Sequence, residues 1–209
     1  MRSTLPLIPA MSALLLAGCS ILSRPFVPVR YYSIDPPAAE PRPGTQPADL
    51  ILAVRALGSA PRYRERILFR RGALAAGFHE NDRWVEPPSD MVTTVLRRTL
   101  EAGGIARVVA DDRLVRRPDL LLDGCLTRFD EVQRDPHWLA ECEIELVLKQ
   151  ADDGSVLFAG RFAASRDAGG KTTAAFVEAM RAAAAEVAAK AAEAVAKALA
   201  EPKKADRKP

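Results

Sequence analysis

The chain has 209 residues, of which 48% are hydrophobic and 27% are charged, and its formal net charge is +3. This composition supplies a folded core, and the length fits one domain with tails. A charge balance this weak gives no indication of nucleic-acid binding, so we expect no nucleic-acid partner.

The N-terminal segment has the parts of an export signal. Arg2 precedes a short apolar stretch, which Pro6 and Pro9 interrupt and which is shorter than the ~20 residues of a membrane span. It ends in Leu16-Ala17-Gly18-Cys19, the pattern of a bacterial lipobox. We therefore expect residues 1–18 to be a lipoprotein signal peptide and Cys19 to be the lipidation site. The alternative is an ordinary signal peptide with a chance cysteine.

The residue after Cys19 bears on location. Ser20 stands where an aspartate would indicate retention at the inner membrane. We therefore expect an outer-membrane protein, anchored by lipid on the periplasmic side. More than one acyl chain on Cys19 is needed for a stable anchor.

Residues 19–49 read as a proline-rich tether, because proline breaks helices and cannot donate to a strand ladder. A possible edge strand lies near 29–34. Strands are expected at 50–57, 67–71 and 74–80, with turns near Gly72 and at Asn81-Asp82. Pro87-Pro88 begins a helix and Gly103-Gly104 ends it.

The second half predicts a sheet and a long helix. Strands are expected at 105–110, 119–131, 138–150 and 156–164, and residues 138–150 alternate between apolar and mostly acidic side chains, as a half-buried strand does. Cys125 and Cys142 fall in neighbouring strands, which leaves open a disulfide or two free thiols. Residues 172–200 form one helix that completes a domain of residues 50–200, and 201–209 are a disordered charged tail.

No catalytic chemistry is evident. Gly169-Gly170-Lys171-Thr172 sits where a phosphate-binding loop would lie, but Ser165 occupies the position of the glycine that such a loop needs. His79 and His137 form no metal-binding or nucleophile motif. We expect no enzyme activity, no cofactor and no metal site.

Two features could contact a partner. The arginines at 62, 64, 66, 70 and 71 form the most basic patch, either the solvated face of a strand or a contact for an acidic partner or lipid head groups. Trp84 is either a hydrophobic staple at the helix start or an exposed docking aromatic. The candidate contact residues are Arg62, Tyr63, Arg64, Arg66 and Trp84.

The order and spacing of several landmarks resemble the ABC-type transport auxiliary lipoprotein family, whose best-known type is paraquat-inducible protein C. They are Leu16–Cys19, Tyr31–Ile34, Tyr63–Arg70, Asn81–Pro88 and Leu121–Asp130. The resemblance implies an α/β fold, a mixed sheet flanked by helices that resembles the N-terminal, anticodon-binding-like domain of TolB. The C-terminal helix is longer than the family leads us to expect.

The resemblance also implies partners: a periplasmic MCE-domain protein with its ABC permease and ATPase. The leading hypothesis is a non-catalytic auxiliary or docking subunit of an MCE-type intermembrane lipid transport system, and a homo-oligomer is plausible. The alternative is an envelope lipoprotein that binds and carries lipid or solute cargo itself, which requires a deep apolar pocket.

Overall fold

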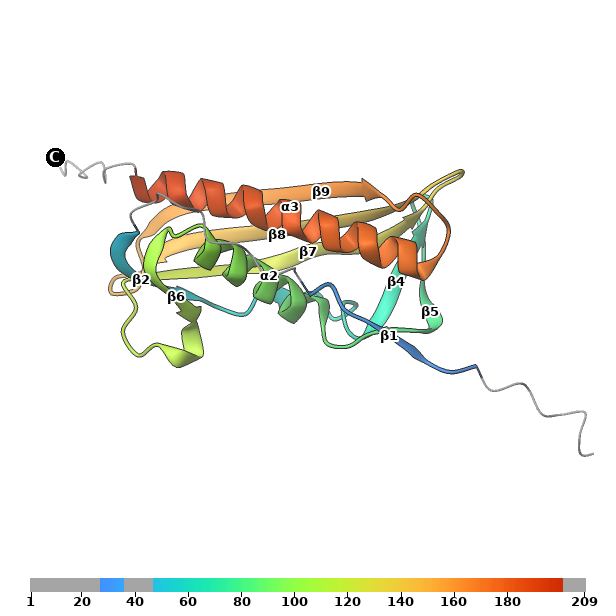
Figure 1. Cartoon of the computed structure of the whole chain (residues 1–209), viewed down its shortest axis with the longest axis horizontal. Coiled ribbons are helices and arrows are strands. Elements are labelled where there is room, and N and C mark those ends of the chain that lie inside the picture. The colour runs from blue at the N-terminus through green and yellow to red at the C-terminus, as the bar shows by residue number, and fades with distance from the viewer. Residues whose placement is uncertain (1–26, 36–46, 201–209) are drawn as a thin grey trace, which may run out of the picture.

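The computed structural model describes residues 27–35 and 47–200. In this part of the chain, nine strands form one curled mixed sheet, and two α-helices cover one of its faces (Figure 1). The prediction of a mixed α/β fold with a long C-terminal helix is therefore confirmed. The expected signal peptide (1–18), Cys19 and the expected charged tail (201–209) lie outside the described residues.

The sheet is organised around one long strand. The strands are β1 (Arg30–Tyr32), β2 (Ala48–Val54), β3 (Gly58–Ser59), β4 (Arg66–Arg71), β5 (Ala75–Trp84), β6 (Ala106–Asp111), β7 (Leu120–Gln133), β8 (Trp138–Gln150) and β9 (Val156–Asp167). On one side, β7 pairs antiparallel with β8, which pairs with β9. On its other side β7 pairs in turn with β2, β3 and β4. β6 extends the sheet beyond β2, and β5 followed by β1 extends it beyond β4.

The alternation along β8 sets the two faces of the sheet. Ala140, Cys142, Ile144, Leu146 and Leu148 are buried toward the helices, while the residues between them are half-buried on the other face. This period of two is the half-buried strand that the sequence predicts. The face away from the helices carries no helix among the described residues and is called the open face below.

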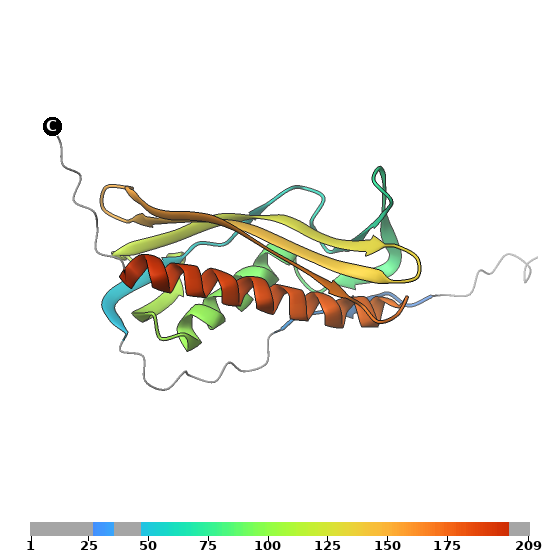
Figure 2. The ribbon, with the colours of Figure 1, turned by 90° about the horizontal axis from the view of Figure 1, so that it is seen from above.

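The helices pack on each other and on the buried face. α2 (Pro88–Ala102) starts with a proline at its first position, and Gly103 caps its end. α3 (Thr173–Ala200) lies along β8 and β9 and against α2 (Figure 2). Its buried side combines Phe176 and Met180 with several alanines, which allow close approach to the sheet. Burying each large side chain contributes about 1.5–3 kcal/mol.

Two expectations about the first half differ from the structure. The turn predicted at Asn81-Asp82 is wrong, because β5 continues to Trp84. That stretch is held extended by β1, which places Arg30 opposite Asp82. β1 itself lies within the stretch expected to be an edge strand, and Ile34 after it is 1% exposed. The pairing of β1 with β5 and the buried Ile34 thus join this segment to a fold that the sequence predicts to start at residue 50.

Candidate interaction surfaces

The connection between β3 and β4 is fixed to the open face by a tyrosine. Tyr63 is 3% exposed, and its hydroxyl donates to Asp130 Oδ1 at 2.8 Å. Arg70 Nε donates to the other oxygen of Asp130 at 2.5 Å, so this buried carboxylate has two partners. Burial, together with the charge of Asp130, raises the pKa of Tyr63, so the hydroxyl remains a donor. The backbone around Tyr63 is therefore held in place.

Three arginines beside this tyrosine point into solvent. We call Arg62, Arg64 and Arg66 the arginine cluster; all three are exposed, and none has a carboxylate partner among the described residues. Arg62 Cζ lies 4.6 Å from the centre of the Tyr63 ring, and Arg66 Cζ lies 4.8 Å from that of Phe78. Stacking on a ring holds a guanidinium without neutralising it. The cluster therefore presents charge that remains available to an anion.

The β4–β5 hairpin projects beside the arginine cluster. Its tip, residues 72–76, turns at Gly72, whose φ of +62° suits glycine. Leu74 at the tip is 97% exposed and is flanked by Ala73 and Ala75, which are also exposed. Seen from above, the hairpin and the β3–β4 connection both rise on the open-face side, away from the helices (Figure 2). An apolar tip and a basic cluster thus share one side of the molecule.

A buried polar cluster holds the base of the hairpin. Asp82 in β5 is 3% exposed and accepts two hydrogen bonds from Arg30, at 2.7 and 3.0 Å, and one from Thr173 Oγ1 at 2.6 Å. His79 lies between two carboxylates, with Nε2 2.9 Å from Glu131 Oε2 and Nδ1 3.7 Å from Asp82 Oδ2. Burial alone would raise the pKa of Asp82, but the hydrogen bonds from Arg30 and Thr173 hold it below its ordinary value.

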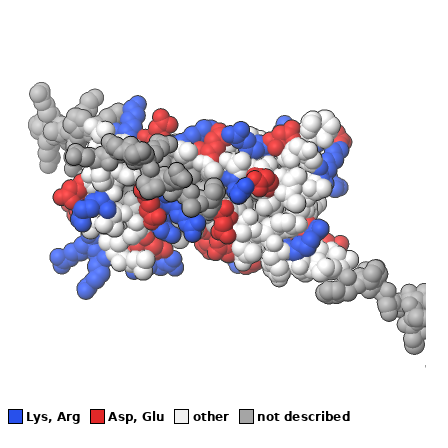
Figure 3. All heavy atoms as spheres, in the orientation of Figure 1, with Lys and Arg blue, Asp and Glu red and all other residues white. Residues whose placement is uncertain are grey.

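A second exposed apolar residue lies at the opposite end of the molecule. The η1 loop (residues 112–119) contains the short helix η1 (Asp112–Leu114), which Asp111 caps. Leu114 is 80% exposed, and Arg116 and Arg117 have no carboxylate partner in the described ranges 27–35 and 47–200. Lys and Arg side chains gather at this end, at the lower left of Figure 3.

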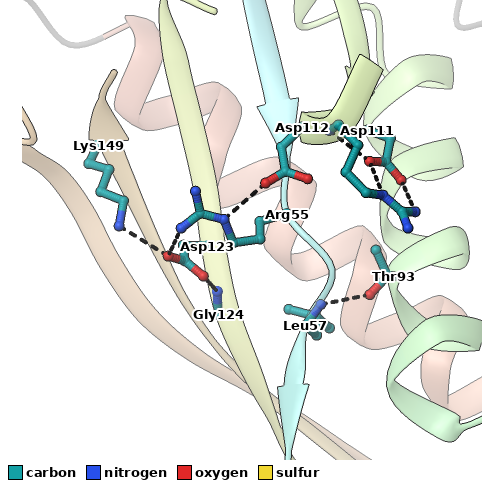
Figure 4. A network of polar contacts seen from close by, with 9 residues as sticks. Arg55, Leu57, Thr93, Asp111, Asp112, Asp123, Gly124 and Lys149 are labelled. Atoms are coloured by element: carbon teal, nitrogen blue, oxygen red, sulfur yellow. Dashed lines mark hydrogen bonds and ion pairs between the residues drawn. The ribbon is translucent and has the colours of Figure 1, made fainter. Parts of the chain in front are cut away.

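The open face between these two ends is neutralised by ion pairs. Arg55 bridges Asp112 and Asp123, each at 3.0 Å, and Lys149 reaches Asp123 at 3.0 Å (Figure 4). The glutamates predicted to form an acidic outer face of β8 are paired as well. Glu141 pairs with Arg128, and Arg161 pairs with both Glu143 and Glu145. This face consequently offers little free charge to a partner.

Comparison with known proteins identifies the family. The model of the ABC-type transport auxiliary lipoprotein component matches residues 32–192, which is most of the chain and nearly all of the described domain. The chain belongs to this family. Among curated proteins, none matches.

Solved structures support the fold of this auxiliary lipoprotein. A Xanthomonas campestris protein of the family-model DUF330 is similar with a TM-score of 0.71 and 22% identity, over 81% of this chain and 96% of that one. A second crystal structure, of an uncharacterized protein, has a TM-score of 0.62 and 15% identity, over 81% and 99% of the two chains. At these identities the similarity concerns the fold.

The structure separates the contact residues that the sequence groups together. Arg62, Arg64 and Arg66 lie at the surface, whereas Tyr63 is buried beneath them. Trp84 is 1% exposed and packs on Phe129 and Phe176, with ring centres 5.3 and 6.0 Å apart. A docking aromatic must be exposed, so Trp84 is a core residue of this auxiliary lipoprotein. The exposed Leu74 and Leu114 were missed, because an isolated leucine between polar or small residues carries no sequence signal.

The remaining predicted site residues also have structural positions. Cys125 and Cys142 are free, because Cys142 faces the helices from β8 while Cys125 lies on the other face of β7, opposite Glu145. Of the two alternatives that the sequence leaves open, the structure has two free thiols. Gly169–Thr172, the segment compared with a phosphate-binding loop, is the turn that leads into α3.

Among the described residues, no group of three His, Cys, Asp or Glu could hold a metal ion. In the same part of the chain, no helix has the length and apolar character to cross a membrane.

Proposed function

We propose that this auxiliary lipoprotein is a non-catalytic docking subunit of an MCE-type ABC system that moves lipid between membranes. The observation that carries the proposal is the family match over residues 32–192, which assigns the chain to the auxiliary lipoproteins of ABC transport. Cys19, with its lipobox, lies only eight residues before the first described residue. A diacylglyceryl group on Cys19 would anchor the domain on the periplasmic side of the outer membrane.

The packing of the interior favours docking over carrying cargo. A cargo carrier needs an apolar pocket of ~300–1,000 Å³. The space between the sheet and the helices is instead occupied by large rings and a continuous apolar layer that includes Trp84, Phe129 and Phe176. These side chains belong to the protein's own core, so the layer where lipid would be expected is filled.

The η1 loop is the surface that we assign to the protein partner. It lies at the end of the domain opposite to β1, and therefore away from the anchored N-terminus (Figure 1). Leu114 supplies an apolar contact, and Arg116 and Arg117 supply unpaired charge. A periplasmic MCE-domain protein with an acidic docking site fits this combination.

The anchor and the docking role are tested separately. Membrane fractionation of a Cys19→Ser variant tests the anchor, and the variant is expected to leave the membrane fraction. Co-purification of the lipidated chain with the MCE-domain protein tests docking. The double variant Arg116→Glu/Arg117→Glu should lose the complex, and Arg97→Glu on α2 is the control.

A homo-oligomer remains part of the proposal, and the mass of the detergent-solubilised protein measures it. Retention of the full complex by the Arg116→Glu/Arg117→Glu variant would place the docking surface elsewhere. Absence of any complex with the wild-type chain would refute the docking role itself.

A further inference from the structure

We propose that the end of the domain formed by β1 and the β4–β5 hairpin lies on the surface of an anionic phospholipid bilayer. This inference rests on the lipid anchor of the proposed function, but it assigns a second, protein-borne membrane contact. The contact would fix the orientation of the domain, which an acylated N-terminus alone does not.

The first observation is the exposed apolar surface at this end. Leu74 at the hairpin tip is 97% exposed, and residues 72–78 contain no charged side chain. Val27 and Val29, which precede β1, are 56% and 43% exposed, and Tyr31 within β1 is 64% exposed. These three residues alternate, so an extended backbone places them on one side. An apolar tip and an apolar row with a tyrosine are the side chains that enter a lipid interface.

The second observation is the charge beside this apolar surface. Residues 62–78 contain five arginines and one glutamate, which gives a formal net charge of +4. Arg70 is neutralised by Asp130, but the arginine cluster has no carboxylate partner in the described part of the chain. Arg66 begins β4 and pairs with Arg83 at the base of the hairpin, so the arginine cluster lies along the hairpin from its tip. Arginines on the same side of the molecule as an exposed apolar tip suit anionic head groups, because the charges stay in water while the tip enters the lipid.

The third observation is the position of the anchor. The eight residues from Cys19 to Val27 reach at most about 29 Å when fully extended. The chain enters the domain at the end that carries the β4–β5 hairpin, while the η1 loop and the end of α3 lie at the opposite end (Figure 1). A bilayer that holds Cys19 is therefore kept close to β1 and its neighbouring hairpin. The arginine cluster and the tip lie on the same side of the sheet, so one surface can meet both (Figure 2).

The test uses two exposed leucines at opposite ends of the same molecule. The lipidated full chain is reconstituted in vesicles of phosphatidylcholine and phosphatidylglycerol that carry brominated acyl chains, which quench nearby tryptophans. Leu74→Trp should be quenched and Leu114→Trp should not. Each variant is compared with the wild type, in which Trp84 and Trp138 give the background signal. Equal quenching of both variants, or of neither in protein that floats with the vesicles, overturns the proposal.

A second arm tests the charge. In a Leu74→Trp background, Arg62→Gln/Arg64→Gln/Arg66→Gln should reduce the quenching on phosphatidylglycerol vesicles. Each lost arginine should weaken the contact between this end of the domain and the bilayer about fivefold. The matched control is Arg116→Gln/Arg117→Gln at the η1 loop, which should leave the quenching of Leu74→Trp unchanged in these vesicles, where no protein partner is present. Vesicles of phosphatidylcholine alone should give weak quenching in every variant. Protection of residue 74 by the MCE-domain protein instead of by lipid would overturn the proposal in favour of a protein contact.

Failure of the anchor can be distinguished from failure of this inference. If the chain does not float with vesicles, the lipid anchor is refuted. The same two tryptophan variants are then attached to nickel-chelating lipid through a histidine tag in place of residues 1–19. Selective quenching of Leu74→Trp in that arrangement supports the membrane contact, and its absence overturns it.

Discussion

Asp82 connects three parts of the chain that are distant in sequence. It accepts hydrogen bonds from Arg30 in β1 and from Thr173 at the start of α3, and it lies in β5. A buried carboxylate costs free energy unless such partners satisfy it. One residue thus fixes the N-terminal strand and the C-terminal helix to the base of the hairpin.

We expect Asp82→Asn to lower the free energy of unfolding by about 2 kcal/mol at neutral pH, less than for a fully buried pair because Arg30 is largely exposed. The pKa of Asp82 is lower in the folded chain than its ordinary value of 3.8. Its stabilising contribution is therefore complete above that value and is lost as the pH falls through the folded-state pKa. Urea unfolding at descending pH should show the difference between wild type and variant disappearing in acid.

The control is Asp49→Asn, which removes an exposed pair with Arg107 and should leave the unfolding free energy nearly unchanged. A pH-independent difference between wild type and Asp82→Asn would contradict the assignment of the effect to the carboxylate charge.

The two cysteines differ in their surroundings. Burial raises the pKa of Cys142 to about 12, so its thiolate is scarce at neutral pH. We expect an alkylating reagent to modify the half-buried Cys125 in the native protein and to modify Cys142 only after denaturation. Mass spectrometry of peptides from each state measures this, and a mass consistent with a Cys125–Cys142 disulfide would show the structure to be wrong here.

At the scale of elements, β7 is the strand on which the sheet depends. β8 pairs along its whole length, and β2, β3 and β4 share its other edge. A register irregularity between Leu126 and Arg128 lets Leu126 and Phe129 both reach the core. Gly124 lies opposite β8, where the backbone of Glu145 leaves no room for a side chain.

Gly124→Ala should destabilise the domain by about 1–3 kcal/mol, as overpacking of a core does. A methyl group there would collide with the carbonyl oxygen of Glu145 and lie 2.7 Å from a methyl carbon of Leu146. Gly58→Ala on the adjacent β3 is the matched control, because its methyl group would meet ordinary contacts of 3.7 and 4.0 Å. Equilibrium unfolding in urea compares them, and equal stability of the two variants would contradict the close approach at Gly124.

Elements with a strong period could be predicted from the sequence, and positions set by tertiary contacts could not. β8 and α3 carry long uninterrupted patterns, and both were located within a residue or two. Asn81-Asp82 has the composition of a turn, but pairing with β1 and the hydrogen bonds of Asp82 keep it extended. The candidate surface was predicted in part: its arginines could be read from their number, while the burial of Tyr63 and Trp84 depends on Asp130 and Phe129, which are far away in sequence.

At the scale of the whole molecule, the domain has two distinct ends. β1 and the β4–β5 hairpin lie at one end, and the η1 loop and the end of α3 lie at the other (Figure 1). At the first end, the residues that follow β1 include Ile34, which is 1% exposed and packs into the core.

Ile34→Ala should therefore lower the free energy of unfolding by about 2–4 kcal/mol, as deletion of a buried isoleucine side chain does. Val29→Ala, on the exposed side of the same segment, should have little effect. Thermal unfolding of the two variants measures the difference. Equal melting temperatures would mean that the segment is not part of the cooperative unit.

The parallel pairing of β1 with β5 also determines how the domain responds to mechanical force. A pull on the residues before Val27, with the η1 end held by a partner, acts along the axis of β1 rather than across it. The three residue pairs of this ladder and the Arg30–Asp82 bridge are then strained together instead of breaking one after another. A short strand in this shearing geometry resists traction better than its length suggests, which suits the proposed anchor at one end and the proposed partner at the other.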